Sequence, residues 1–122
     1  MLAYLYDLHH LGYYHGDLQP KWIKFTNNKV VKVQNPLLYT SYKNSYYYRL
    51  SNDTYRSTFS PELLKNYEFR DQNLKVNWEK CDVFSFGISM LSAASKKDWT
   101  IFYDFFENKI QVQKLFYEIE EL

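Results

Sequence analysis

Apolar residues recur at helical spacing near the start of the chain and form one dense stretch further on. Leucine occupies every third position over 2–11, a pattern typical of an amphipathic helix. Gly12 follows directly and is the expected C-terminal stop. The stretch 81–95 is apolar on nearly all sides, so we expect a helix there that is buried on nearly all sides.

Between these two stretches the pattern changes to that of a β-hairpin. Apolar residues at 22–25 precede Asn27-Asn28, a pair that favours a turn, and the valines of 30–33 form a return strand. Lys32 is expected to face outward, and Pro36 to end the strand. The segment 37–59 is rich in Tyr, Ser and Asn and predicts a long loop.

A second helix is predicted after this loop, and one or two more at the end of the chain. Ser60 is a suitable N-cap, and Pro61 suits the first helical position. The segment 99–122 repeats apolar residues at amphipathic spacing, ending in Leu115, Phe116, Ile119 and Leu122. These elements together predict a mainly α domain of the α+β class.

Composition limits the function classes. The chain has 122 residues and a net charge of +1, which fits one domain without the basic face that nucleic acid or anionic membrane requires. Cys81 is the single cysteine, so the reducing cytosol is the default compartment. No apolar run reaches the ~20 residues that span a bilayer. Aromatic residues make up 20% of the chain, and Tyr and Trp are enriched in protein interfaces.

Three motifs carry a resemblance to a known family. They are His9-x-x-Gly12-x-x-His15-Gly16-Asp17-Leu18-Gln19-Pro20, Ser60-Pro61-Glu62 and Asp82-Val83-Phe84-Ser85-Phe86-Gly87. In this order they are similar to the catalytic loop, the APE motif and the start of helix F of eukaryotic protein kinases. The resemblance covers roughly residues 2 to 95 and implies a single, truncated domain like a kinase C-terminal lobe. Its expected parts are the end of helix E (1–12), the catalytic-loop and DFG-like hairpin (13–36), an activation-segment-like region (37–62), a helix F-like segment (80–95) and a helical tail (99–122).

The resemblance also implies that catalysis is lost. Asp17 occupies the catalytic-base position, but Gln19 replaces the catalytic-loop lysine. Trp22 replaces the metal-binding asparagine and Asn35 replaces the metal-binding aspartate of the DFG motif. A tryptophan cannot ligate Mg²⁺, and phosphoryl transfer depends on such positioning and charge. We therefore expect no enzyme activity, no bound nucleotide, no metal and no other cofactor.

The remaining family positions are expected to be structural. The resemblance implies that Asp82 accepts hydrogen bonds from the backbone around His15 and Gly16. Pro61 and Gly87 keep their motif positions. Because Gly16 replaces an arginine, we do not expect regulation through a phosphorylated activation loop.

Two further questions stay open at this stage. Glu62 would pair with a late arginine in the family, and here it is either solvated or paired with Arg56, Arg70 or a partner chain. A metal site formed by His9, His10 and His15 is an alternative, but no cysteine or carboxylate completes it.

These observations favour a catalytically inactive, pseudokinase-like structural subunit that binds other protein subunits in a hetero-complex. One alternative is a kinase remnant that binds nucleotide or is completed by an N-terminal lobe supplied in trans. The second alternative is an unrelated helical interaction module. A cytoplasmic location is expected, and a cytoskeletal or ciliary assembly is one host we consider. The candidate contacts are aromatic, and core filling is their alternative role: Trp22, Tyr39, Tyr42, Tyr46, Tyr47, Tyr48, Trp99, Phe102 and Phe105.

Overall fold

The computed structural model describes residues 2–16, 18–28, 30–34, 58–69 and 76–122. These residues form helices and two small antiparallel sheets, as expected for an α+β protein. In chain order the elements are α1 (Leu2–His10), the 3-10 helix η1 (Pro20–Trp22), β1 (Ile23–Phe25), β2 (Val31–Val33), α3 (Pro61–Phe69), α4 (Trp78–Ser95), the 3-10 helix η2 (Trp99–Phe102), β3 (Tyr103–Asp104), β4 (Lys109–Ile110) and α5 (Val112–Glu120).

Helix α1 ends where the sequence predicts. Gly12 has a φ of +83°, a left-handed conformation that glycine adopts without a steric penalty. The turn is closed by the N–H of Tyr13, which donates to the carbonyl of Leu8 at 3.1 Å. Leu5 is buried, but Leu11 is 73% exposed, because the turn carries it off the apolar face of the helix.

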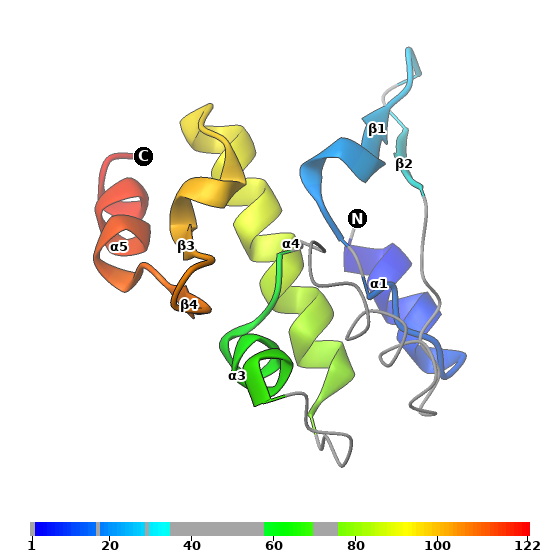
Figure 1. Ribbon diagram of the computed structural model, residues 1–122. Coiled ribbons are helices and arrows are strands. Elements are labelled where there is room, and N and C mark those ends of the chain that lie inside the picture. The colour runs from blue at the N-terminus through cyan, green and yellow to red at the C-terminus, as the bar shows by residue number, and fades with distance from the viewer. Residues whose placement is uncertain (1, 17, 29, 35–57, 70–75) are drawn as a thin grey trace.

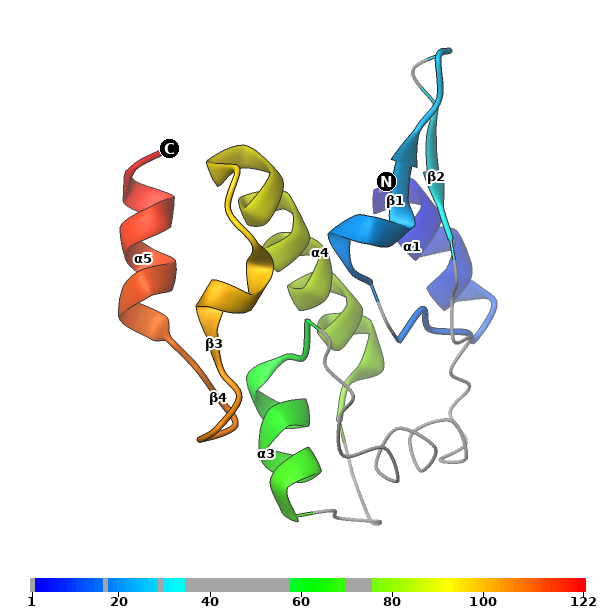
Figure 2. The same ribbon diagram turned by 45° about the horizontal axis from the view of Figure 1, so that its top comes forward.

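The predicted hairpin is present. Strand β1 pairs with β2 in the register Ile23↔Val33, Lys24↔Lys32 and Phe25↔Val31. At its base, the N–H of Gln34 donates to the carbonyl of Trp22 at 2.8 Å. Figures 1 and 2 show the tip of this hairpin projecting away from the rest of the chain.

Helix α4 lies in the middle of the molecule (Figure 1), with α1 and the β1–β2 hairpin on one side and α3, η2, β3 and α5 on the other. It begins at Trp78, three residues before the predicted start at Cys81, because the side chain of Asn77 caps it by accepting the N–H of Lys80 at 3.1 Å. Three buried residues of α4, Cys81, Ile88 and Leu91, belong to the hydrophobic core. The other core residues are Phe59, Leu63, Leu64, Phe102 and Tyr103.

The expectation that this helix is buried on nearly all sides is wrong. Val83 is 50% exposed and Met90 is 48% exposed. The buried positions are instead shared with polar residues, namely Asp82, Ser85, Ser89 and Ser92. These side chains are buried because loop backbone groups packed against the helix need hydrogen-bond partners.

The prediction for the tail is partly wrong as well. Helix α5 forms, but residues 103–110 form the β3–β4 hairpin rather than a helix. The carboxylate of Asp104 accepts the N–H groups of Phe106 and Glu107 at 3.1 and 3.0 Å, and Asn108 has a φ of +51°. Asp and Asn favour turns of this kind because their short side chains bond the local backbone.

Within the described ranges, no helix combines the length and the hydropathy that crossing a bilayer requires.

Candidate functional site

The carboxylate of Asp82 is the centre of the site. It lies in the second turn of α4 and is 3% exposed. It accepts the backbone N–H of His15 at 2.8 Å, the N–H of Gly16 at 3.0 Å and the Nε2 of His9 at 2.8 Å. The hydrogen bonds expected between Asp82 and the backbone at 15 and 16 are therefore present. A buried carboxylate is stable only with donors of this kind.

The loop that receives these hydrogen bonds is held in one conformation. Gly16 has a φ of +80°, so its position favours glycine over a residue with a side chain. The ring of His15 is fully buried, and its Nε2 donates to the carbonyl of Gln34 at 3.1 Å. His15 thus connects the loop to the residue that follows β2, a packing and hydrogen-bonding role.

Helix α1 closes the other side of the carboxylate. The ring of His9 lies 5.4 Å from that of Tyr14, and Tyr14 lies 6.4 Å from Trp78 at the start of α4. Burial, and secondly the negative charge of Asp82, raises the pKa of the Tyr4 hydroxyl. The carboxylate of Asp82 therefore joins α4 to α1 and to the loop of residues 15–16.

The three histidines do not converge on a metal site. His9 binds Asp82 and His15 binds the carbonyl of Gln34, whereas His10 stacks on Tyr6 with ring centroids 5.9 Å apart. Among the described residues, no three His, Cys, Asp or Glu side chains are grouped so that they could hold a metal ion.

Two serines of α4 fix a second pair of backbone segments, which sequence reasoning missed. The hydroxyl of Ser85 donates to the carbonyl of Thr58 at 2.5 Å. The single hydroxyl proton of Ser89 is shared between the carbonyls of Ser85, at 2.9 Å, and Leu18, at 3.3 Å. Thr58 also donates its own hydroxyl to Leu18 at 2.5 Å. The available signal was the spacing of Asp82, Ser85, Ser89 and Ser92, which places four polar residues on one face of an apolar helix.

Cys81 extends this polar network towards α3. Its thiol accepts the hydroxyl of Ser60 at 3.2 Å and donates to the carboxylate of Glu62 at 3.6 Å. Burial above all raises the pKa of the thiol to about 12, with a smaller contribution from the charge of Glu62. The thiol is therefore protonated at neutral pH and is not a nucleophile.

The sequence left two alternatives for Glu62, namely solvation, or pairing with Arg56, Arg70 or a partner chain. Glu62 lies at the exposed start of α3, where Pro61 is the first helical residue. Arg56 and Arg70 lie outside the described residues, so an ion pair with either of them, one of the alternatives left open by the sequence, is not tested.

The positions expected to be catalytic relics are only partly described. Gln19 is 4% exposed, and Trp22 is half-buried in η1, with the ammonium of Lys21 4.7 Å from its ring centroid. Asp17 and Asn35 lie outside the described residues. Trp22 is the residue that the resemblance assigns to a metal-ligand position.

The aromatic contact candidates fall into three groups: fully buried, half-buried, and outside the described residues. Phe102 is fully buried, so core filling is its role in the chain. Trp99 and Phe105 are half-buried and meet edge to face, with centroids 6.0 Å apart, and Phe105 stacks on the buried Tyr103 at 5.4 Å. Tyr39, Tyr42, Tyr46, Tyr47 and Tyr48 lie outside the described residues.

An apolar groove lies between α4 and α5. It encloses about 490 Å³. The motif glycine Gly87 is exposed here, and a Cβ at this position would meet no described atom within 4 Å. The groove is lined by Phe84, Gly87, Ile88, Met90, Leu91, Ala94, Leu115, Ile119 and Leu122.

Comparisons of this chain with protein-family models, with curated proteins and with solved structures give no match. Its interpretation therefore depends on the three motifs and on the contacts described above.

Proposed function

We propose that this chain is a protein scaffold like a kinase C-terminal lobe that does not transfer phosphate and that serves as a protein-binding subunit of a larger assembly. The observation that carries the proposal is the Asp82 carboxylate, which accepts the N–H groups of His15 and Gly16. This contact joins two of the three motifs through residue pairs that are 67 and 66 positions apart in the sequence, as the resemblance implies.

The polar groups at this site are used for structure. The Asp82 carboxylate and the hydroxyls of Ser85 and Ser89 all bond backbone groups or α1. The Cys81 thiol is protonated. These groups are buried and bonded to the chain itself, so they lack the access to a substrate that a catalytic base or nucleophile needs.

The positions that would hold a nucleotide support the same conclusion. Trp22 offers no oxygen ligand for Mg²⁺, which prefers carboxylates, phosphates and water. The chain contains three glycines in total, Gly12, Gly16 and Gly87, so it has no glycine-rich loop to cover phosphates. Without metal ligands and such a loop, little of the electrostatic stabilisation of phosphoryl transfer remains.

The exposed apolar surface supports the protein-binding part of the proposal. On the face between α4 and α5, Met90, Ile119 and Leu122 are 48%, 49% and 67% exposed. Contiguous apolar patches of this kind on a soluble protein mark interaction sites. A partner that covers the groove would bury these side chains.

A phosphotransfer assay tests the first half of the proposal. Purified chain with radiolabelled ATP and Mg²⁺ is expected to label neither itself nor a generic acceptor protein, and Mg²⁺–ATP is expected to leave its Tm unchanged. Transfer of phosphate by the purified chain would contradict the proposal. A rise in Tm of several degrees without transfer would favour the nucleotide-binding alternative.

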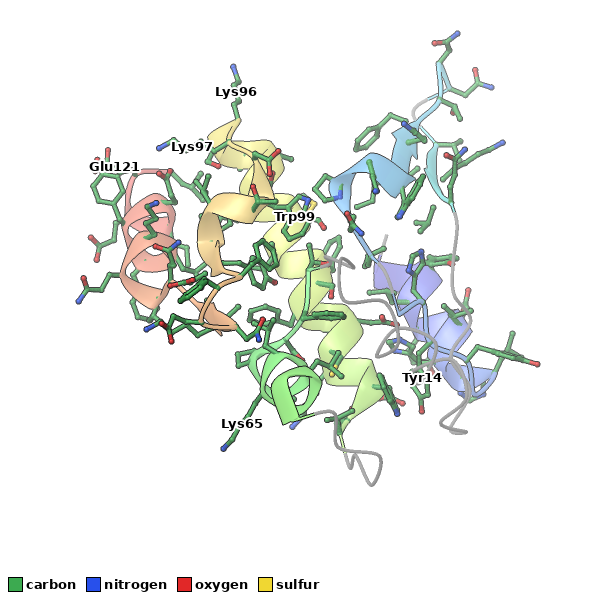
Figure 3. All side chains as sticks on the ribbon, viewed as in Figure 1. Tyr14, Lys65, Lys96, Lys97, Trp99 and Glu121 are labelled. Atoms are coloured by element: carbon green, nitrogen blue, oxygen red, sulfur yellow. The ribbon has the colours of Figure 1, made fainter. Side chains whose placement is uncertain are left out.

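Site-specific cross-linking tests the second half. A photoreactive amino acid placed at Met90 in the native host is expected to form a discrete adduct with another protein. The matched control is Lys65, which points away from the chain on α3 (Figure 3) and is expected to form none. If Met90 forms no adduct and the chain migrates as a monomer in the same extract, the subunit role is wrong.

A further inference from the structure

Charge is divided unevenly along the chain. Residues 18–52 contain six Lys or Arg and no Asp or Glu, whereas the remaining residues contain nine basic and fourteen acidic side chains. The β1–β2 hairpin belongs to the basic part, and its tip projects away from the rest of the chain (Figures 1 and 2). A chain with a net charge of +1 thus presents a locally basic element.

Two lysines face each other across this hairpin. Lys24 and Lys32 are direct cross-strand partners, and both are exposed. Side chains in such a pair have Cβ atoms about 5 Å apart, and two like charges there destabilise the pairing. Neither lysine forms an ion pair with any carboxylate in the described part of the chain. Lys21 in the adjacent η1 is also exposed.

The opposite face of the same hairpin is apolar and open. Because side chains alternate along a strand, Phe25 and its partner Val31 lie on the face away from the two lysines. Phe25 is 76% exposed, and Val30 beside the turn is 50% exposed. Each strand pairs only with the other within the described residues, so each has an outer edge of backbone N–H and C=O groups that can accept another strand.

We propose that the β1–β2 hairpin binds an extended acidic segment of a partner protein. Such a segment pairs with an edge of the hairpin as an added strand, a common mode of peptide recognition. A segment at the β1 edge places a carboxylate beside Lys24, and one at the β2 edge places it beside Lys32. Its other residues place apolar side chains on the face of Phe25 and Val31. The carboxylates relieve the repulsion between the two lysines, so the free hairpin favours a partner of opposite charge.

The charge distribution favours an acidic protein segment over nucleic acid. Outside residues 18–52 the chain carries a net charge of −5, from nine basic and fourteen acidic side chains. This charge repels a polyanion that extends beyond the hairpin. Nucleic-acid affinity also grows with the number of phosphates neutralised, and the described hairpin with η1 offers three lysines.

A peptide-binding measurement tests the inference, which rests on the proposed protein-binding role. The probe is a fluorescent peptide of about nine residues, a common strand length, in which Glu alternates with Val and Thr. Fluorescence anisotropy at about 0.1 M salt, where the Debye length is about 10 Å, is expected to show saturable binding to the chain. The double variant Lys24→Glu with Lys32→Glu is expected to weaken binding about tenfold or more.

The control is the double variant Lys65→Glu with Lys114→Glu, which changes the net charge equally at two exposed lysines of α3 and α5. It is expected to weaken binding less than about twofold, since general charge effects are screened beyond a Debye length. A matched peptide with Lys in place of Glu is expected not to bind. Circular dichroism melts verify that both double variants are folded.

Four results would overturn the inference. They are no binding of the acidic peptide, equal losses in the two double variants, tighter binding of an oligo-dT strand to the hairpin lysines, and dimerisation of the chain that the hairpin variant abolishes. If any of these occurs while Met90 still cross-links to another protein, the hairpin inference alone fails and the proposed function stands.

Discussion

Replacing Asp82 by alanine tests whether this carboxylate holds the loop of residues 15–16 on α4. The substitution leaves three donors without their acceptor, namely the N–H groups of His15 and Gly16 and the Nε2 of His9. The His9 side chain is 10% exposed and can turn towards water. The two backbone N–H groups are held by the conformation of the loop and cannot turn towards water.

The expected loss of unfolding free energy follows from the backbone N–H groups of His15 and Gly16. A buried donor left without a partner costs about 1–3 kcal/mol, so the Asp82→Ala variant is expected to lose about 2–6 kcal/mol. A domain of this size has a free energy of unfolding of roughly 5–15 kcal/mol, so the loss is a large fraction of the total. Asp82→Asn keeps one carbonyl acceptor and is expected to lose about half as much.

Urea denaturation followed by circular dichroism measures these differences at neutral pH. The control is Glu79→Ala, one turn earlier on the same helix, where the carboxylate is exposed and the expected change is within about 0.5 kcal/mol. Amide hydrogen exchange adds a local measurement, because the N–H groups of His15 and Gly16 are expected to exchange faster in both Asp82 variants. If both variants unfold at the wild-type urea midpoint with unchanged exchange, the carboxylate does not hold the loop.

Three further predictions concern the core, the thiol and the hairpin. Phe102→Ala removes a fully buried ring and is expected to cost about 3–5 kcal/mol in urea unfolding, whereas Phe106→Ala, at a position 93% exposed, is expected to change little; equal losses would contradict the core assignment. Because the pKa of Cys81 is raised from 9.0 to about 12, its contribution to stability is fully present below pH 9 and is lost between about pH 9 and 12. Cys81→Ala is therefore expected to flatten the fall in Tm over that range. A thiol reagent at pH 8 is expected to label the urea-unfolded chain far faster than the native chain. Similar labelling rates would refute the burial of the thiol. Lys24→Glu alone converts the like-charge pair with Lys32 into an opposite-charge pair, and we expect a gain of about 0.2–1 kcal/mol in unfolding free energy that added salt reduces.

Local signals in the sequence were sufficient for the short elements. Gly12 predicted the end of α1, Asn27-Asn28 predicted the turn between β1 and β2, and Pro61 predicted the start of α3. Each of these depends on the conformational preference of one or two residues. Such preferences act within a few residues of the chain, so the sequence reveals them directly.

The contact between Asp82 and residues 15–16 could not be predicted from local pattern. It joins segments separated by more than 60 residues, and its expectation came from the resemblance alone. The polar stripe of Ser85, Ser89 and Ser92 was missed because serine in a helix also suits an exposed face. The exposure of Val83 and Met90 was missed because hydropathy does not show which apolar faces lack a neighbour.

The use of serine at Ser85 and Ser89 has a consequence for which replacements these positions tolerate. A serine hydroxyl extends only one bond beyond Cβ, so each hydroxyl meets a loop carbonyl that lies close to the helix surface. Both serines are buried, so a longer polar residue such as glutamine offers the same kind of donor but has to displace atoms that pack around these positions. The acceptable substitutions at these two positions are therefore limited by side-chain length as strictly as by polarity.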